Sequence, residues 1–133
     1  MLRVSLRSLR SGGFDLAYVD GFVIAVPTAN KEKFRQFGEE FDQLFRKHGA
    51  TQVIEAWGED VPKGETTDFY KAVKAKDDET IVFSWIFWPD KATRDAGNEK
   101  VMADMEAMGD EAGKMPFDGK RMIYGGFDVL VEL

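Results

Sequence analysis

Two polar residues near position 95 have the types and the spacing needed to hold a small organic molecule. Arg94 and Asn98 are four residues apart, so they share one face if this segment is a helix. A guanidinium and an amide on one face can orient a carboxylate or an enolate oxygen of a substrate. Gly97 lies between them and is a poor helix former, which indicates that something approaches the backbone closely. The alternative is an ordinary solvated or ion-paired helix face.

The chain has one histidine and no cysteine, which restricts the chemistry further. Thiolate metal sites and multi-histidine metal sites are excluded, and a histidine-based triad is disfavoured. His48 is a candidate general base, but its place directly before Gly49 also fits a structural role at a helix end. No dinucleotide, P-loop, zinc-hydrolase or calcium-loop motif is present, so we expect no metal and no cofactor.

Aromatic and acidic residues of the expected strands supply further candidates. Trp85 and Tyr124 each carry a polar tip that needs a partner when buried, although core or interface packing explains most aromatic residues. Glu55 shares a strand face with Trp57, and a partly buried acid needs a partner or a raised pKa. Arg121 is a plausible partner in a structural ion pair. The candidate ligand-binding residues are Glu55, Trp57, Trp85, Arg94, Asn98, Arg121 and Tyr124, and the candidate catalytic residues are Arg94, Asn98, Tyr124 and His48.

Hydrophobic periodicity predicts the elements that position these residues. Phenylalanines at helical spacing predict a helix between Asn30, as its N-cap, and Gly49, as its stop. The charged residues between them, Asp42 included, are expected on the solvent side. Asp90 is expected to cap a second helix that runs to about Met105. Strands are predicted at 18–26, 50–57, 79–88 and 121–131, the last with a bulge or a close backbone approach at its two glycines, and residues 69–75 fit either a short helix or a strand.

This order predicts an α+β, ferredoxin-like βαββαβ fold, in which a four-stranded antiparallel sheet carries both helices on one face. The strand at 79–88 is apolar on both sides, with Phe83 and Trp85 on one side and Ile86 and Trp88 on the other. An antiparallel sheet covered on one side only should alternate apolar and polar residues. We therefore expect a second copy to cover the bare face, so that the chain forms a homodimer through its sheet faces.

Charge divides the chain into a basic N-terminal segment and an acidic body. The net charge is −6, but no acid precedes Asp15, and residues 15–133 hold 15 basic against 24 acidic residues, a net charge of −9. An acidic body disfavours nucleic acid and an anionic membrane surface as partners. We expect residues 1–17 to be a disordered basic extension and residues 18–133 to be a single domain. A transit peptide is an alternative for the extension, a secretory signal is disfavoured, and we expect a cytoplasmic location.

Five strings in order resemble one bacterial family of proteins of unknown function. They are YVDGFV at 18–23, EAWGEDVP at 55–62, VFSWI at 82–86, RDAGNEKVMAD at 94–104 and MPFDGKRMIYGGF at 115–127. The resemblance covers residues 18 to about 128 and implies membership of the dimeric α+β barrel superfamily, whose ferredoxin-like protomers pair through their sheets. Family members begin next to the tyrosine numbered 18 here, so a wrongly chosen start codon is a further explanation of residues 1–17.

Three functions follow from the residues and the resemblance together. The first is a small-molecule-binding homodimer with a pocket between sheet and helices in each protomer. The second is a cofactor-independent monooxygenase- or isomerase-like enzyme that acts by enolisation, and the third is a structural or stress-response dimer without a ligand. Fold likeness alone does not transfer a reaction. An apolar cavity that gathers Arg94, Asn98 or Glu55 favours the first two, and a filled core favours the third.

Overall fold

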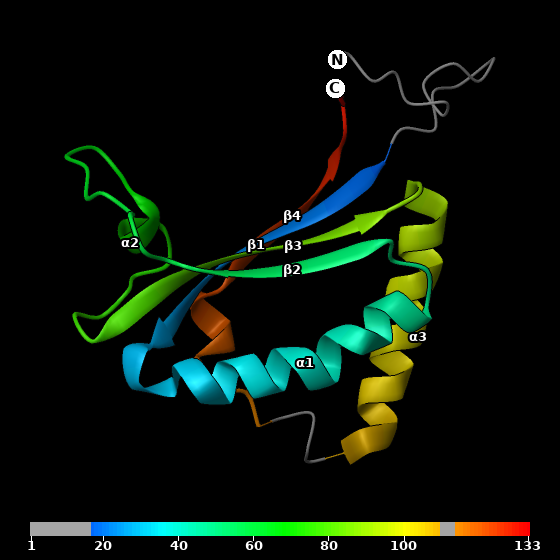
Figure 1. The fold of residues 1–133 in the computed structure, drawn as a ribbon, viewed down its shortest axis with the longest axis horizontal. Helices are drawn as coiled ribbons and strands as arrows, with labels where there is room; N and C mark the ends of the chain where they lie inside the picture. Colours follow the sequence, from blue (N-terminus) through cyan, green and yellow to red (C-terminus); the bar gives the residue numbers. More distant parts are fainter. Residues whose placement is uncertain (1–16, 110–113) are drawn as a thin grey trace.

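A computed structural model describes residues 17–109 and 114–133, and its centre is a four-stranded sheet (Figure 1). The strand order is β2-β3-β1-β4 and every neighbouring pair is antiparallel, with the strands β1 (Tyr18–Pro27), β2 (Gln52–Trp57), β3 (Glu79–Trp88) and β4 (Ile123–Asp128). Each βαβ unit is split by a strand of the other unit. The predicted α+β fold is confirmed. Residues 1–16 lie outside the described ranges, so the extension at 1–17 and the single domain at 18–133 stay predictions.

Two long helices, α1 (Lys31–Lys47) and α3 (Lys91–Met108), lie on the same face of the sheet (Figure 1). The cap of α3 forms as predicted, because the Asp90 side chain accepts a 2.7 Å hydrogen bond from the backbone N–H of Thr93. The stop of α1 also forms as predicted. Gly49 has a φ of +114° there, and the N–H of Ala50 donates back to the Phe45 carbonyl over 2.9 Å.

Two local details differ from the sequence predictions, and a third observation decides between two predicted alternatives. A 3-10 turn at Thr28–Asn30 precedes α1, so the Asn30 side chain does not cap that helix but donates to the Pro116 carbonyl over 3.1 Å. A second 3-10 turn at Gly119–Arg121 delays the start of β4. Gly126 pairs with β1 in unbroken register, so there is no bulge, and the alternative of a close approach is confirmed. A Cβ at Gly126 would lie only 2.7 Å from the Arg94 Nη2.

A short helix, α2 (Phe69–Ala72), lies on the opposite face of the sheet, at one end of the strands (Figure 1). Residues 69–75 therefore contain a helix rather than a strand. Val73, directly after α2, is fully buried against Ala25 and Ile81. The face that was expected to be bare is thus covered at one end by the connection between β2 and β3.

The remainder of that second face is an exposed apolar surface, which we call the open face. Phe83 is 45% exposed and Phe127 is 59% exposed, whereas Val82 and Trp88, which point toward the helices from β3, are fully buried. A groove of about 590 Å³ runs along the open face. The residues that define the open face are Val19, Gly21, Val23, Phe83, Trp85, Phe87, Ile123 and Phe127.

Within the described ranges no helix is long and apolar enough to span a bilayer. The same residues contain no group of three or more histidine, aspartate or glutamate side chains placed to hold a metal ion. The expected cytoplasmic location stays a prediction.

Candidate functional site

A small, partly open chamber of about 140 Å³ lies between the sheet and the helices. Its lining comes from β1, β2, β3, α1, α3 and the segment that leads into β4. Most of the lining is apolar, and six of its side chains are phenylalanines: the apolar set is Phe22, Ile24, Phe34, Phe37, Phe41, Phe45, Ile86, Met105, Phe117 and Met122. The polar members are Asp42, Glu55 and Ser84. Three polar groups in an apolar chamber are the usual composition of a small-molecule site.

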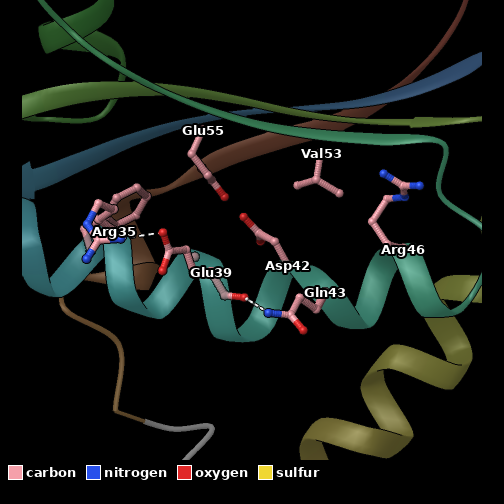
Figure 2. A pocket seen from close by; sticks show the side chains of 9 residues that line it. Arg35, Glu39, Asp42, Gln43, Arg46, Val53 and Glu55 are labelled. Atoms are coloured by element: carbon pink, nitrogen blue, oxygen red, sulfur yellow. Dashed lines mark hydrogen bonds and ion pairs between the residues drawn. The ribbon is translucent and has the colours of Figure 1, made fainter.

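Asp42, which is half-buried, and Glu55, which is exposed on β2 rather than partly buried, form a carboxyl pair at the chamber. Asp42 points from α1 toward the sheet, and Glu55 points from β2 toward Asp42 (Figure 2). Burial, the hydrogen bond with Glu55 and the charge of Glu55 together raise the pKa of Asp42 to about 9, with burial as the largest cause. An ionised carboxylate can only accept hydrogen bonds, so two carboxyl groups that bond to each other share a proton. Asp42 therefore keeps its proton at neutral pH, beside the charge of Glu55.

The position of Asp42 overturns the prediction that this residue lies on the solvent side of α1. Asp42 is four residues after Gly38 and eight after Phe34, and residues at this spacing lie along the same face of a helix. Phe34 and Gly38 are both buried. A Cβ at Gly38 would lie 3.4 Å from the Asp42 Oδ2 and 3.5 Å from the Glu55 Cγ, so position 38 directly adjoins the pair. The sequence signal was a glycine followed four residues later by an acid, within a stripe of phenylalanines.

An outer groove of about 470 Å³ leads from solvent to the carboxyl pair. Asp42 and Glu55 line both this groove and the chamber, so the pair stands between the two. The groove runs between α1 and β2 (Figure 2), and Arg35 on its rim is already ion-paired with Glu32 and Glu39. The full lining is Phe34, Arg35, Gly38, Glu39, Asp42, Gln43, Arg46, Val53 and Glu55.

Ser84 reaches the chamber from the centre of the sheet. It is the register partner of Glu55, so the two side chains lie next to each other on one face. Ser84 is only 3% exposed, and no hydrogen bond joins its hydroxyl to another described residue. A hydroxyl without a partner in apolar surroundings costs about 1–3 kcal/mol. Sequence analysis missed Ser84, although it is the one polar residue within the run IVFSWIFW of β3.

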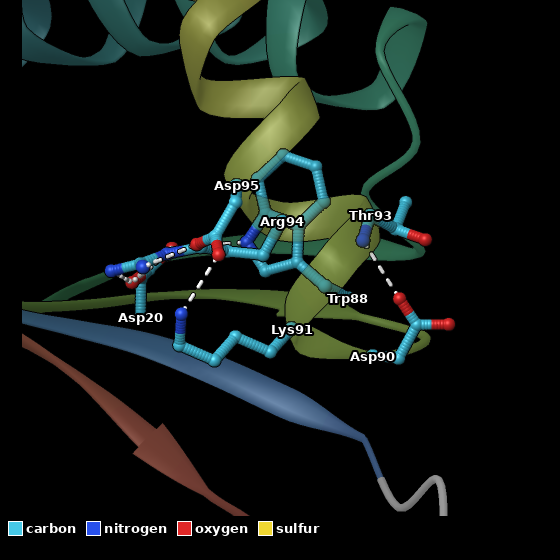
Figure 3. Close-up of polar contacts among 7 residues, drawn as sticks. All are labelled: Asp20, Trp88, Asp90, Lys91, Thr93, Arg94 and Asp95. Atoms are coloured by element: carbon cyan, nitrogen blue, oxygen red, sulfur yellow. Dashed lines mark hydrogen bonds and ion pairs between the residues drawn. The ribbon is translucent and has the colours of Figure 1, made fainter.

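Arg94 belongs to a different cluster, on β1 and α3 (Figure 3). Its Nη2 lies 2.8 Å from the Asp20 Oδ1, and the Trp88 Nε1 donates to the other carboxylate oxygen over 3.0 Å. Gly97 is approached closely, as expected, but by the Trp88 ring and the His48 carbonyl. A Cβ at Gly97 would lie 2.8 Å from the His48 carbonyl oxygen. The approach is therefore explained by packing within the chain, and a substrate clamp of Arg94 with the half-buried Asn98 stays a prediction.

Arg121 does not pair with Glu55, so that prediction is wrong. β2 and β4 lie at opposite edges of the sheet, and Arg121 at the start of β4 cannot reach across two strands. It binds Glu79 of β3 instead, with both guanidinium nitrogens 2.7 Å from the two carboxylate oxygens. These hydrogen bonds hold the pKa of Glu79 below its usual value.

The other predicted site residues are scattered. His48 caps α1, and its Nε2 lies 2.7 Å from the Asp104 Oδ2 on α3. Trp57 packs against Phe34 below the sheet. Trp85 lies on the open face, and its Nε1 is buried without a partner in the described part of the chain. Tyr124 is 73% exposed on the edge strand. Of the predicted residues, Glu55 is the one that lines the chamber.

Comparison with known proteins identifies relatives over most of the chain. Residues 17–119 match the family described as "Protein of unknown function (DUF1428)". Proteins called "Uncharacterized protein YbaA" from Escherichia coli K12, Escherichia coli O157:H7 and Shigella flexneri are each 49% identical to this chain over 119 residues. The aligned region is 88% of this chain and 99% of each relative. The resemblance to a bacterial family of unknown function is confirmed.

Proposed function

This chain belongs to the DUF1428 family, and we propose that it binds a small organic molecule in the chamber between its helices and its sheet. The single observation behind the proposal is that an aromatic chamber, a carboxyl pair and an unpaired hydroxyl coincide at one place. A filled core would have supported a purely structural role. The groove gives a ligand a route to the pair without any opening of the fold.

A thermal-shift screen of metabolites, read against a blocked variant, tests this proposal. Gly38 lines the groove beside the carboxyl pair, so a Gly38→Leu side chain should obstruct it while favouring the helix. Gly38→Ala is the matched control, because its Cβ meets neighbours at ordinary contact distances. We expect compounds that stabilise the wild type and the alanine variant but not the leucine variant. Hits that stabilise all three proteins equally would place binding elsewhere.

The proposal includes a homodimer formed through the open face. No charged residue lines the groove on this face, whereas the acidic body makes two copies repel elsewhere. An uncharged apolar patch is where two copies of such a chain can meet at low electrostatic cost.

Sedimentation velocity of a charge-substituted chain tests the dimer. Phe127→Asp introduces a charge on the open face, and we expect it to convert a dimeric mass to a monomeric mass at micromolar concentration. Met102→Asp is the control, because Met102 is 66% exposed on α3, away from the sheet. A monomeric wild type, or the same response from both variants, would exclude an interface on the open face.

The carboxyl pair also supports a second candidate, an isomerase-like enzyme that needs no cofactor. The ionised carboxyl of the Asp42–Glu55 pair could remove a proton from the carbon beside a substrate carbonyl, while the protonated carboxyl donates its proton to the carbonyl oxygen. The enol then collapses as both protons return, with one of them placed on a different carbon. Exchange of ketone α-protons for deuterium, followed by NMR, would detect the step, and its absence for every hit of the screen would leave binding as the function.

A further inference from the structure

The size of the chamber and its three polar groups indicate the chemical class of the ligand that the proposed function requires. We infer that the chamber takes a single aromatic ring that bears a hydroxyl group, with the hydroxyl held between the Asp42–Glu55 pair and Ser84. This inference rests on the proposed function and adds a ligand class to it.

The volume of the chamber sets the size of the ring. Apolar protein cavities of about 150 Å³ are known to hold one benzene molecule. The chamber here measures about 140 Å³, and aromatic side chains surround it from α1, from β1 and from the segment before β4. Phe34 already makes edge contacts of this kind, with its ring centroid 5.8 Å from that of Phe117. A planar ring is therefore the shape that this lining accommodates.

The polar groups require both a donor and an acceptor on the ligand. The ionised half of the Asp42–Glu55 pair accepts a hydrogen bond, and the shared proton or the Ser84 hydroxyl can donate one. A phenolic hydroxyl does both with one oxygen atom. It would also give Ser84 the hydrogen-bond partner that this 3%-exposed side chain lacks within the described residues.

Charge excludes the two obvious competitors. A ring carboxylate would bring a second negative charge against the pair, which no basic side chain of the chamber lining offsets. Of the two guanidinium groups along the groove, Arg35 is already held by Glu32 and Glu39, and Arg46 is exposed; neither lines the chamber. A ring ammonium would carry a full charge into a chamber lined almost wholly by apolar groups, and burying it costs more than burying a neutral hydroxyl.

Calorimetric titration of the full chain with four ring compounds tests the inference. The probes are phenol, toluene, benzoate and benzylammonium, which share the ring and differ in the substituent. We expect phenol to bind about tenfold more tightly than toluene, the difference of roughly one good hydrogen bond, and benzoate not to bind. In Asp42→Asn with Ser84→Ala the preference for phenol over toluene should disappear while toluene still binds. Toluene binding as tightly as phenol, or benzylammonium binding most tightly, would overturn the inference.

The outcome separates this inference from the proposed function. If none of the four probes binds, yet the metabolite screen yields compounds that Gly38→Leu excludes, then the chamber binds a ligand of another class and only the inference fails. If no compound responds to Gly38→Leu, then both fail. Asp42→Asn removes a half-buried acid and Ser84→Ala removes a hydroxyl without a described partner, so we expect the double variant to fold. A loss of its preference for phenol can then be attributed to the lost contacts with the ligand.

Discussion

Acidic side chains that face the interior of this molecule are accommodated in two different ways. Asp20 and Glu79 each face an arginine, with Arg94 and Arg121 making short, multiple hydrogen bonds to them. Asp42 faces another acid, and no basic side chain contributes to the shift of its pKa. In the arginine pairs the positive charge of the guanidinium balances the carboxylate. Asp42 instead keeps a proton, which it can donate to or exchange with another group.

The difference separates structural ion pairs from the candidate site. The Asp20 cluster also takes the indole N–H of Trp88 and places Arg94 over the ring of Tyr18, 5.1 Å from its centroid. Asp20 thus accepts hydrogen bonds from two side chains of the chain itself. The Asp42–Glu55 pair instead lies at a chamber. Four substitutions test this contrast.

Arg94→Ala should have the largest effect. It leaves the carboxylate of Asp20, which is 6% exposed, without its cation, and breaking a buried ion pair in this way costs about 3–5 kcal/mol. Urea unfolding at pH 7 measures the loss. Lys91→Ala is the control, because its exposed ion pair with Asp95 contributes less than about 1 kcal/mol. Equal losses in the two variants would remove the distinction between the buried pair and a surface pair.

Arg121→Ala should destabilise the fold by about 3 kcal/mol at pH 7, because it leaves the buried carboxylate of Glu79 without its cation. The folded-state pKa of Glu79 is lowered, so the stabilisation by this pair is present above the usual value of 4.5 and is lost as the pH falls through the lower folded value. We expect the difference in stability between the wild type and the variant to shrink as the pH falls below 4.5. A constant difference from pH 3 to pH 7 would contradict the assignment.

Asp42→Asn should have the opposite sign. The folded-state pKa of Asp42 is raised from 3.8 to about 9, so the native protein holds the proton more tightly and loses stability as the pH rises between those values. The asparagine variant lacks this slope, and at pH 9 we expect it to exceed the wild type by on the order of 2 kcal/mol. Glu40→Gln, an exposed acid on the same helix, should leave the slope unchanged. Parallel curves of stability against pH for the wild type and Asp42→Asn would show that Asp42 does not hold a proton in the folded state.

Ser84→Ala should have the smallest effect, a gain of about 1 kcal/mol, because it removes a buried hydroxyl without a described partner. Thr80→Ala on the same strand should lose stability instead, since the Thr80 hydroxyl bonds that of Thr28 over 2.7 Å. Thermal unfolding of the two variants measures both changes in stability, with a higher melting temperature expected for Ser84→Ala and a lower one for Thr80→Ala. A destabilised Ser84→Ala would show that the hydroxyl contributes to the fold rather than standing ready for a ligand.

The fold could be predicted where local signals agreed with one another. The run ETIVFSWIFW and its bounding proline fixed β3, and Asp90 and Gly49 marked helix ends with residues that perform those roles. The candidate site was harder to predict because its parts come from separate elements. Glu55 was identified, but its partner was sought in Arg121, since a single sequence does not say which strands are neighbours. The charge of Asp42 predicts a place on the solvent side of its helix, although Asp42 lies one helical turn after the buried Gly38 and next to position 38 in the structure.

The three tryptophans divide the molecule into regions that can be observed separately. Trp88 is fully buried in the Asp20 cluster, Trp57 packs beside the chamber residue Phe34, and Trp85 lies on the open face. Chains that keep one indole and carry phenylalanine at the other two positions would each emit from one region. Quenching by acrylamide would then report separately on the interior, on the neighbourhood of the chamber and on the surface proposed to pair. Intrinsic fluorescence thus distinguishes occupation of the chamber from association of chains, without any attached label.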